Sequence, residues 1–149
     1  MIPKFRAWLK EERKMYPVYT INFTPEGELE SVVPINTEEH KTNKHYWPDP
    51  EKPDNIILMQ STGLKDINDK EIYEGDVIKV SNGLCDIDEE NPFVVVKWDE
   101  EAGGYTMKDF TGEFDALNIG WQIADKLVRV EVVGNIYENP ELVKEAQGG

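Results

Sequence analysis

The chain is poor in cysteine, in basic residues and in long apolar segments. Cys85 is the only cysteine among the 149 residues, so one chain cannot form a disulfide, and a reducing compartment is the better expectation. No apolar run approaches the roughly 20 residues that cross a bilayer. The opening sequence MIPKFRAWLKEERK has no apolar stretch between its charges, which argues against a secretory signal. We therefore expect a cytoplasmic protein that does not enter a membrane.

Catalytic motifs are missing as well. The sequence contains no G-x-S-x-G nucleophile turn, no phosphate-binding loop and no G-x-G-x-x-G fingerprint. Cys85 is followed by Asp86, and an acidic neighbour disfavours the thiolate that a nucleophilic cysteine needs. Carboxylates are so abundant that no single pair indicates a hydrolase. We therefore expect a protein that is not an enzyme and binds no cofactor.

Acidic residues outnumber basic residues, and the imbalance lies almost wholly in one part of the chain. The sequence has 30 Asp or Glu against 16 Lys or Arg, a net charge of −14. Residues 1–50 hold seven basic and eight acidic residues, whereas residues 51–149 hold nine and 22. Proteins bind phosphate backbones through Lys and Arg, so this surface disfavours direct binding of DNA or RNA. The charge fits either simple solubility or a protein that mimics nucleic acid.

The residues that are present favour a globular fold rich in β-structure. Hydrophobic residues make up 39% of the chain and aromatic residues 10%, more than disordered chains contain. Residues 5–8 and 15–23 have strand composition, and the turn at 25–27 predicts a hairpin that returns along residues 29–35. Pro34 places the end of this last strand at a sheet edge. We expect this edge, and that of an isolated strand at 5–8, to be open to a second subunit.

Residues 36–55 form a long segment with three prolines in its second half and no periodicity, which predicts an exposed loop. His40, His45 and Asp49 are weak candidates for metal ligands, because two imidazoles and a carboxylate can hold Zn²⁺ or Fe²⁺. Tyr46 and Trp47 are candidates for partner binding, because an exposed aromatic pair can anchor an interface. The alternative is that Trp47 folds back over the sheet as a lid.

Strand patterns continue through the second half of the chain. The apolar run 56–59 predicts a buried strand that residues 60–63 bring to an end. Further strands are expected at 77–80, 93–98, 105–110 and 127–137. Turns fall at 65–70 and 74–76, and Gly134 interrupts the last strand as a bulge or bend.

The last residues of the chain carry the signals that begin a helix. Asn139 is a suitable N-cap and Pro140 suits the first helical turn. The whole pattern predicts a mainly β, β-rich α+β protein: a curled antiparallel sheet or a small SH3-like barrel, with an N-terminal hairpin and a short C-terminal helix. We expect one domain over residues 1–149, comprising an N-terminal β segment (1–35), an exposed loop (36–55), a barrel-like core (56–138) and the helix (139–147).

Three blocks of sequence resemble the YopX family of phage and prophage proteins. They are KFRAW at residues 4–8, LMQSTGLKD with EIYEGDVI within residues 58–78, and VVGNIYENPEL at residues 132–142. The resemblance implies a YopX-like domain and a phage context, hence the cytoplasm of a bacterial host, and it implies no reaction.

We expect the residues of these blocks to serve structure, namely Arg6, Trp8, Gly63, Glu74, Gly75, Asp76, Gly134, Asn139 and Pro140. Arg6 is expected to form a bidentate pair with Glu74, Asp76 or Glu138. Its alternative role is as an exposed side chain that binds an anionic ligand.

Three functions remain open from the sequence. The first is a non-enzymatic phage or prophage accessory protein that acts through contacts with a host or phage protein and forms a homo-oligomer. The second is an acidic decoy, or nucleic-acid mimic, that blocks a nucleic-acid-binding protein. The third is a metal-dependent enzyme that uses the loop containing His40 and His45.

Overall fold

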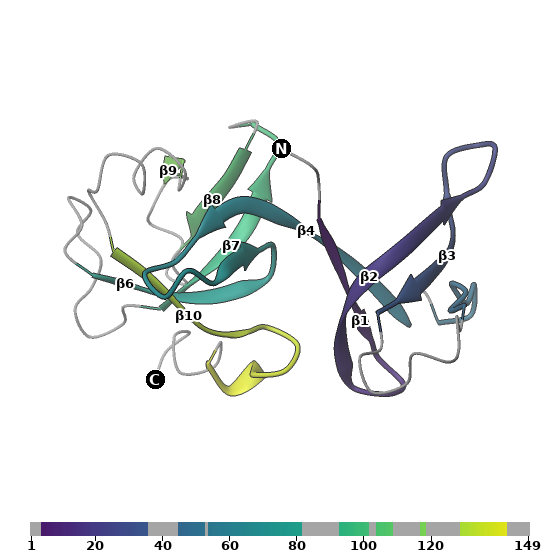
Figure 1. Ribbon diagram of the computed structural model, residues 1–149, viewed down its shortest axis with the longest axis horizontal. Coiled ribbons are helices and arrows are strands. Elements are labelled where there is room, and N and C mark those ends of the chain that lie inside the picture. The colour runs from purple at the N-terminus through teal and green to yellow at the C-terminus, as the bar shows by residue number, and fades with distance from the viewer. Residues whose placement is uncertain are drawn as a thin grey trace. The chain divides into compact units, whose positions relative to one another are not determined.

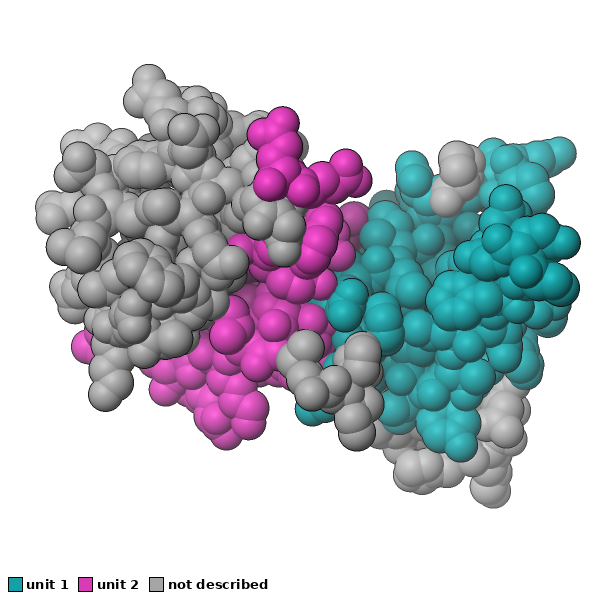
Figure 2. All heavy atoms as spheres, turned by 90° about the horizontal axis from the view of Figure 1, so that it is seen from above, with its two compact units in different colours: residues 1–60 teal, residues 61–149 magenta. Residues whose placement is uncertain are grey.

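The computed structural model describes residues 4–35, 45–52, 54–81, 93–101, 104–108, 117–118 and 129–142. Within these ranges the protein is mainly β, as predicted, with two five-stranded antiparallel sheets. The sheets are not closed into a barrel, so the open-sheet alternative describes the fold. The chain divides into two compact units, residues 1–60 and residues 61–149 (Figures 1 and 2). No helix in the described part is long and apolar enough to cross a membrane.

The first sheet has the strand order β3-β2-β1-β4-β5. β1 (Phe5–Leu9) pairs with β2 (Lys14–Phe23) on one side and with β4 (Ile56–Lys65) on the other. The N-terminal strand is therefore central, and the expectation that it is isolated with an open edge is wrong. Its side chains Ala7 and Leu9 are buried with Val32 and Ile56 in the core of the first unit, which explains why the strand lies inside the sheet.

β2 and β3 (Leu29–Pro34) form the predicted hairpin. Gly27 closes the turn with φ = +86°, a backbone conformation that suits glycine, and its amide donates to the Thr24 carbonyl at 2.9 Å. The pairing shifts register between Val18 and Thr20, so Tyr19 is the extra residue of a β-bulge. A second shift lies at the end of β2, between Asn22 and Phe23. β3 is at the edge of the sheet, as Pro34 predicted.

β4 is longer than the sequence predicted. The strand does not end at residues 60–63 but continues to Lys65, and it passes through Gly63 at φ = +79°. Its first half pairs with β1, from Ile56 to Gln60, and its second half pairs with β5 (Glu71–Tyr73) at Ser61 and Lys65. The boundary between the two units falls inside this strand.

The second sheet has the order β10-β6-β7-β8-β9. Its strands are β6 (Asp76–Ser81), β7 (Phe93–Asp99), β8 (Gly104–Lys108), β9 (Leu117–Asn118) and β10 (Arg129–Asn135). A core of buried aliphatic side chains packs in this unit: Ile72, Ile78, Val94, Val96 and Val130. β10 carries the predicted irregularity, because its register against β6 shifts between Val132 and Gly134.

Helical structure is described only at Pro140–Leu142. Asn139 directly precedes it, as the sequence predicted, and the remainder of the expected helix, residues 143–147, lies outside the described residues. The division of residues 1–149 into the four segments of one domain stays a prediction.

Candidate functional site

Residues 45–52, called the strap here, are attached at Tyr46 to the outer edge of β3 in the first unit. The Val32 amide donates to the Tyr46 carbonyl, and the Tyr46 amide donates to the Val32 carbonyl, both at 2.9 Å. The Tyr46 side chain also packs against the core cluster that contains Val32. The expected exposed loop is therefore anchored at this point, and part of the open edge of β3 is covered.

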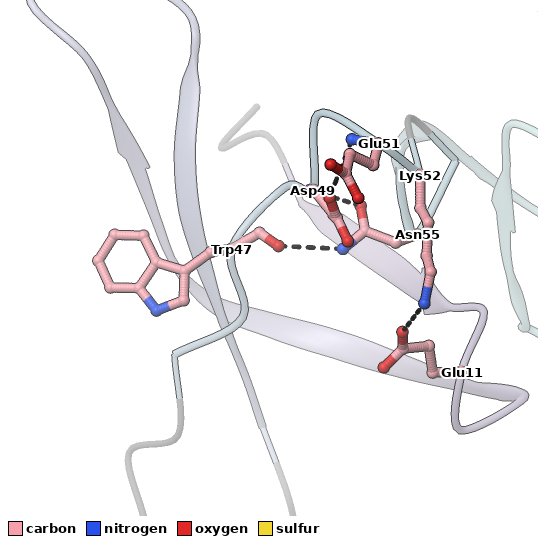
Figure 3. A network of polar contacts seen from close by, with 6 residues as sticks. All are labelled: Glu11, Trp47, Asp49, Glu51, Lys52 and Asn55. Atoms are coloured by element: carbon pink, nitrogen blue, oxygen red, sulfur yellow. Dashed lines mark hydrogen bonds and ion pairs between the residues drawn. The ribbon is translucent and has the colours of Figure 1, made fainter.

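Trp47 follows this anchor and is itself held by a second one (Figure 3). The Asn55 side-chain amide donates to the Trp47 carbonyl at 3.0 Å, and its oxygen accepts the Asp49 amide at 3.1 Å. Asn55 is fixed in turn because its own carbonyl accepts the Lys10 amide at 3.0 Å. The indole projects away from this polar network (Figure 3) and is 57% exposed. The interpretation of Trp47 as a buried lid is wrong, and its exposure agrees with the partner-binding interpretation.

The strap is also tied to the turn between β1 and β2. The Tyr46 hydroxyl donates to Oε1 of Glu12, and burial together with this bond raises the pKa of Tyr46. Lys52 forms an ion pair with Glu11 at 3.2 Å (Figure 3). Both partners of that pair are largely exposed, so it stabilises the strap weakly. The backbone bonds and Asn55 fix the strap, and the ion pair is secondary.

Alternation along the strands shows which side chains share a face with Trp47. Tyr46 opposes Val32 and packs on the core side, so its neighbours His45 and Trp47 point to the other face. Their rings are stacked, with centroids 5.8 Å apart and planes inclined by 21°.

The same face continues across the hairpin. Val33 and Ile35 flank core-facing Pro34, and Ile35 donates its amide to the Pro17 carbonyl at 2.7 Å. Tyr19 follows Pro17 by two residues. We call this set the aromatic face; its members are Pro17, Tyr19, Val33, Ile35, His45 and Trp47.

Every member of the aromatic face except Val33, which is buried, is exposed. Tyr19 is 72% exposed, Trp47 57% and Ile35 39%. Tyr19 owes its position to the β-bulge, a feature that often redirects a side chain next to a functional site. Its exposure could not be read from sequence, because strand composition at residues 15–23 predicts a core role for this tyrosine.

The candidate metal ligands are only partly within the described residues. His40 lies outside them, as do Cys85 and the acidic run at 86–90. His45 stacks on Trp47, and Oδ1 of Asp49 accepts the Glu51 amide at 2.9 Å. In the described part of the chain, no three His, Cys, Asp or Glu side chains gather to hold a metal ion. The complete ligand set stays a prediction.

The block around Gly75 shapes a turn in the second unit. Gly75 has φ = +85°, its amide donates to the Val96 carbonyl and its carbonyl accepts the Ile136 amide. Asp76 is buried, and its Oδ2 accepts the Tyr73 amide at 2.8 Å. These contacts fix the backbone of the turn, and the expectation that the residues of this block serve structure alone stays a prediction.

Glu74 lies between Tyr73 and Gly75 in the sequence, and its charge influences the pKa of Tyr105. Burial first, and then the charge of Glu74, raises the pKa of Tyr105. The ring of Tyr105 meets Trp98 edge to face, with centroids 5.1 Å apart.

The last block shapes a second turn. A Cβ on Gly134 would lie 2.4 Å from Oδ1 of Asn139, so this position has no room for a side chain. Oδ1 of Asn139 accepts the Asn135 amide at 3.2 Å. Asn135 is buried, and its oxygen accepts the amides of Tyr137 and Glu138. Sequence reasoning missed Asn135, although an Asn between strand and helix signals is typical of such a turn.

Asp66 is the other structural residue that the sequence analysis missed. Its carboxylate accepts the amides of Asn68 and Lys70, at 2.8 and 2.9 Å, and of Val132 at 2.9 Å. Burial alone raises the pKa of Asp66, but these three amides outweigh it and hold the pKa below its usual value. The contact with Val132 covers the outer edge of β10, and the Ile67 amide adds a bond to the Val130 carbonyl. The signal available in the sequence was the Asp-x-Asn spacing of the KDINDK turn.

Two residues of the first block lie on one face of β1. Trp8 is buried, 8% exposed, and Arg6 is half-buried with its Nε shielded from water. The pairing of Arg6 with a named carboxylate stays a prediction. Pro140 is exposed at the start of the helical residues.

The fold is that of a small, mainly β protein with two open antiparallel sheets. Side chains in the turns accept hydrogen bonds from nearby main-chain amides. An exposed tryptophan, Trp47, lies on the strap. The family model of the YopX protein matches residues 4–144. The chain therefore belongs to the YopX family, which confirms the resemblance.

Two solved structures are similar to this chain. Protein EF1440 from Enterococcus faecalis is 26% identical, with 96% of this chain and 99% of that chain covered and a TM-score of 0.66. Protein yopX from Bacillus subtilis is 22% identical, covers 93% of this chain and 96% of its own, and has a TM-score of 0.59, a similarity of fold. No curated protein matches the chain.

Proposed function

We propose that this protein is a non-enzymatic accessory protein of a phage or prophage, and that it acts by binding another protein through Trp47. One observation carries the proposal: the Trp47 side chain is exposed and stacks on His45, while its backbone is held by the Tyr46–Val32 pair on one side and by Asn55 on the other. An aromatic side chain that is fixed before binding loses little conformational entropy on binding, and tryptophan is among the residues that most often dominate interface energy.

The roles of the family blocks support the non-enzymatic part of the proposal. Asp66, Asp76 and Asn135 are buried polar side chains of the second unit, and each accepts at least one main-chain amide. Groups engaged in this way are not available as a general acid or base. The YopX-family proteins of E. faecalis and B. subtilis carry no activity in their names, so the proposal rests on the geometry.

Site-specific photo-crosslinking in a host lysate tests the proposal. A photoreactive phenylalanine analogue at position 47 should form an adduct with one partner, and Trp47→Ala should lose that partner on pull-down. Trp98→Ala is the matched control, because Trp98 is 50% exposed but lies on β7 of the second unit. Equal loss of the partner in both variants would contradict a site at Trp47.

The salt dependence separates this proposal from the decoy alternative. Residues 61–149 hold eight basic and 20 acidic residues, and capture through that charge should fall steeply as ionic strength rises. Capture through Trp47 should persist at about 0.5 M salt, where exposed charges are screened within roughly 4 Å. Loss of the partner at that salt in the unmodified protein would favour the decoy.

A further inference from the structure

The aromatic face carries an unusual combination of exposure and neutrality. In the described strands of the first unit, the register places further residues on the same side of the sheet as the aromatic face: Arg6, Trp8, Met15, Thr20, Asn22, Ser31, Ile57 and Met59. Arg6 is the one charged residue in that set, and it is half-buried. Trp8, Val33 and Ser31 are buried on this side. The part of it that stays open is formed by the exposed members of the aromatic face, and none of these is an acidic residue, a lysine or an arginine, although the protein has a net charge of −14.

The two units differ strongly in charge. Residues 1–60 hold eight basic and ten acidic residues, a net of −2, whereas residues 61–149 have a net of −12. Two copies of this chain repel each other through their second units. Their first units are close to neutral, so this is where like copies meet at the lowest electrostatic cost.

We infer that the aromatic face binds a second copy of this chain, face against face. A pairing about a two-fold axis places the same patch on both sides, so the patch must not repel itself. An apolar patch with aromatic members meets this condition, and Tyr19 and Trp47 supply large contact surfaces on rigid supports. A basic partner would instead require carboxylates among the exposed members of this face, and the aromatic face has none.

The size of the patch sets the strength of the dimer. The exposed members lie on three segments, β2, the end of β3 and the strap. Three segments about 4.8 Å apart, each exposed over about 15 Å, cover on the order of 200 Å². That is about a quarter of one partner's share in a standard interface. We therefore expect a weak dimer whose formation depends on protein concentration. The inference concerns the same surface as the proposed function and rests on Trp47 being a protein-binding residue.

Sedimentation velocity of the purified full chain, over a series of concentrations, tests the inference. The unmodified protein should shift from the mass of one chain toward two, and Trp47→Ala or Tyr19→Ser should weaken association by about tenfold or more. Trp98→Ala is the control and should leave association unchanged. Higher salt should strengthen the dimer, because it screens the repulsion between the second units.

Three outcomes would overturn the inference. The first is a strict monomer at every concentration up to about 1 mM, where even a weak interface of this size forms. The second is association that Trp98→Ala weakens as much as Trp47→Ala does. The third is association that salt abolishes. The chain could prove to be a monomer while Trp47→Ala still loses the host partner found by crosslinking. That result would exclude the dimer, and the proposed function would stand.

Discussion

Gly134 lies so close to Asn139 and Leu142 that only a residue without a side chain fits between β10 and the segment that follows it. A Cβ at this position would lie 2.4 Å from Oδ1 and 2.8 Å from Cγ of Asn139, and 3.0 Å from Cδ1 of Leu142. Real Cβ atoms do not approach other atoms so closely, so Gly134→Ala must displace the Asn139 side chain and its bond to Asn135. We expect a loss of about 1–3 kcal/mol in the free energy of unfolding, as in other overpacked sites, measured by urea denaturation.

Gly27→Asn is the matched control for this glycine. Gly27 has a positive φ, but no atom lies within 4 Å of the point that a Cβ would occupy there, and asparagine tolerates that backbone conformation. The free energy of unfolding should change by less than about 0.5 kcal/mol, as at other exposed sites. Equal losses in the two variants would show that close packing at Gly134 is not the cause.

Asp66 links the stability of the second unit to pH. The pKa of the folded-state carboxyl lies below its usual value of 3.8, so its contribution is fully present above about pH 4 and is lost as pH falls through the folded pKa. Asp66→Asn retains one acceptor oxygen in place of two charged ones. We expect it to lower the free energy of unfolding at pH 7 by about 1–3 kcal/mol, with a smaller difference near pH 3.

Asp69→Asn is the control, and urea denaturation at both pH values is the measurement. The Asp69 side chain is 83% exposed and pairs with Lys65 at 3.4 Å, and its φ of +62° suits asparagine. Its substitution should change stability by less than about 0.5 kcal/mol. If the difference between Asp66→Asn and the unmodified protein is the same at pH 7 and pH 3, the carboxylate does not carry the effect.

At the scale of elements, Asn55 determines how firmly the strap lies on the edge of β3. Asn55→Ala removes the bonds to the Trp47 carbonyl and the Asp49 amide and so leaves the pairing of Tyr46 with Val32 without its neighbouring support. We expect amide hydrogen exchange at Tyr46 and Val32 to speed up by about tenfold, which corresponds to the loss of a typical net hydrogen bond of about 1.4 kcal/mol. Amides of β1 and β4 should exchange at unchanged rates.

Asn68→Ala, in the turn that Asp66 closes, is a control in the other unit. It should leave exchange at Tyr46 and Val32 as it is in the unmodified protein. If Asn55→Ala raised the exchange rates equally across β1, β3 and β4, the whole sheet would have been destabilised. The strap would then not open independently of the sheet.

Most strands could be predicted from sequence because they follow local composition and turn chemistry. The hairpin of β2 and β3, the turns at Gly27 and Gly75 and the irregularity at Gly134 were all visible in this way. The position of β1 in the centre of its sheet was not, because pairing between distant segments leaves no local pattern. The length of β4 was missed because Gly63 is typical of the end of a strand, whereas here it lies within one.

The candidate site was predictable only in part. Tyr46 and Trp47 stood out because they interrupt a polar, proline-rich segment. Tyr19 did not, since a tyrosine within a strand pattern is usually buried and its exposure follows from a one-residue bulge. Asn55 gave no signal, because its role depends on Trp47 and Asp49 lying within reach of both ends of its side chain.

At the scale of the whole molecule, the negative net charge disfavours binding of nucleic acids. Residues 61–149 have a net charge of −12 and residues 1–60 of −2, so neither unit has the basic surplus that neutralises phosphates. We expect no gel shift of duplex DNA or single-stranded RNA at about 0.15 M salt, where nonspecific binders still hold nucleic acid at micromolar affinity or weaker. A clear shift would contradict this expectation, and an unrelated basic DNA-binding protein serves as the positive control.

The path of β4 through both units has a consequence for genetic recombination between members of this family. Residues 56–60 of the strand complete the sheet pairing of β1, and residues 61–65 supply the partner of β5. A genetic crossover between two diverged family genes at this boundary would therefore build β4 from halves of different parents, and a unit transferred alone would carry only half of the strand. The family model spans residues 4–144 without division. Recombination between genes of this family should exchange the whole coding segment, and neither half should travel alone into other proteins.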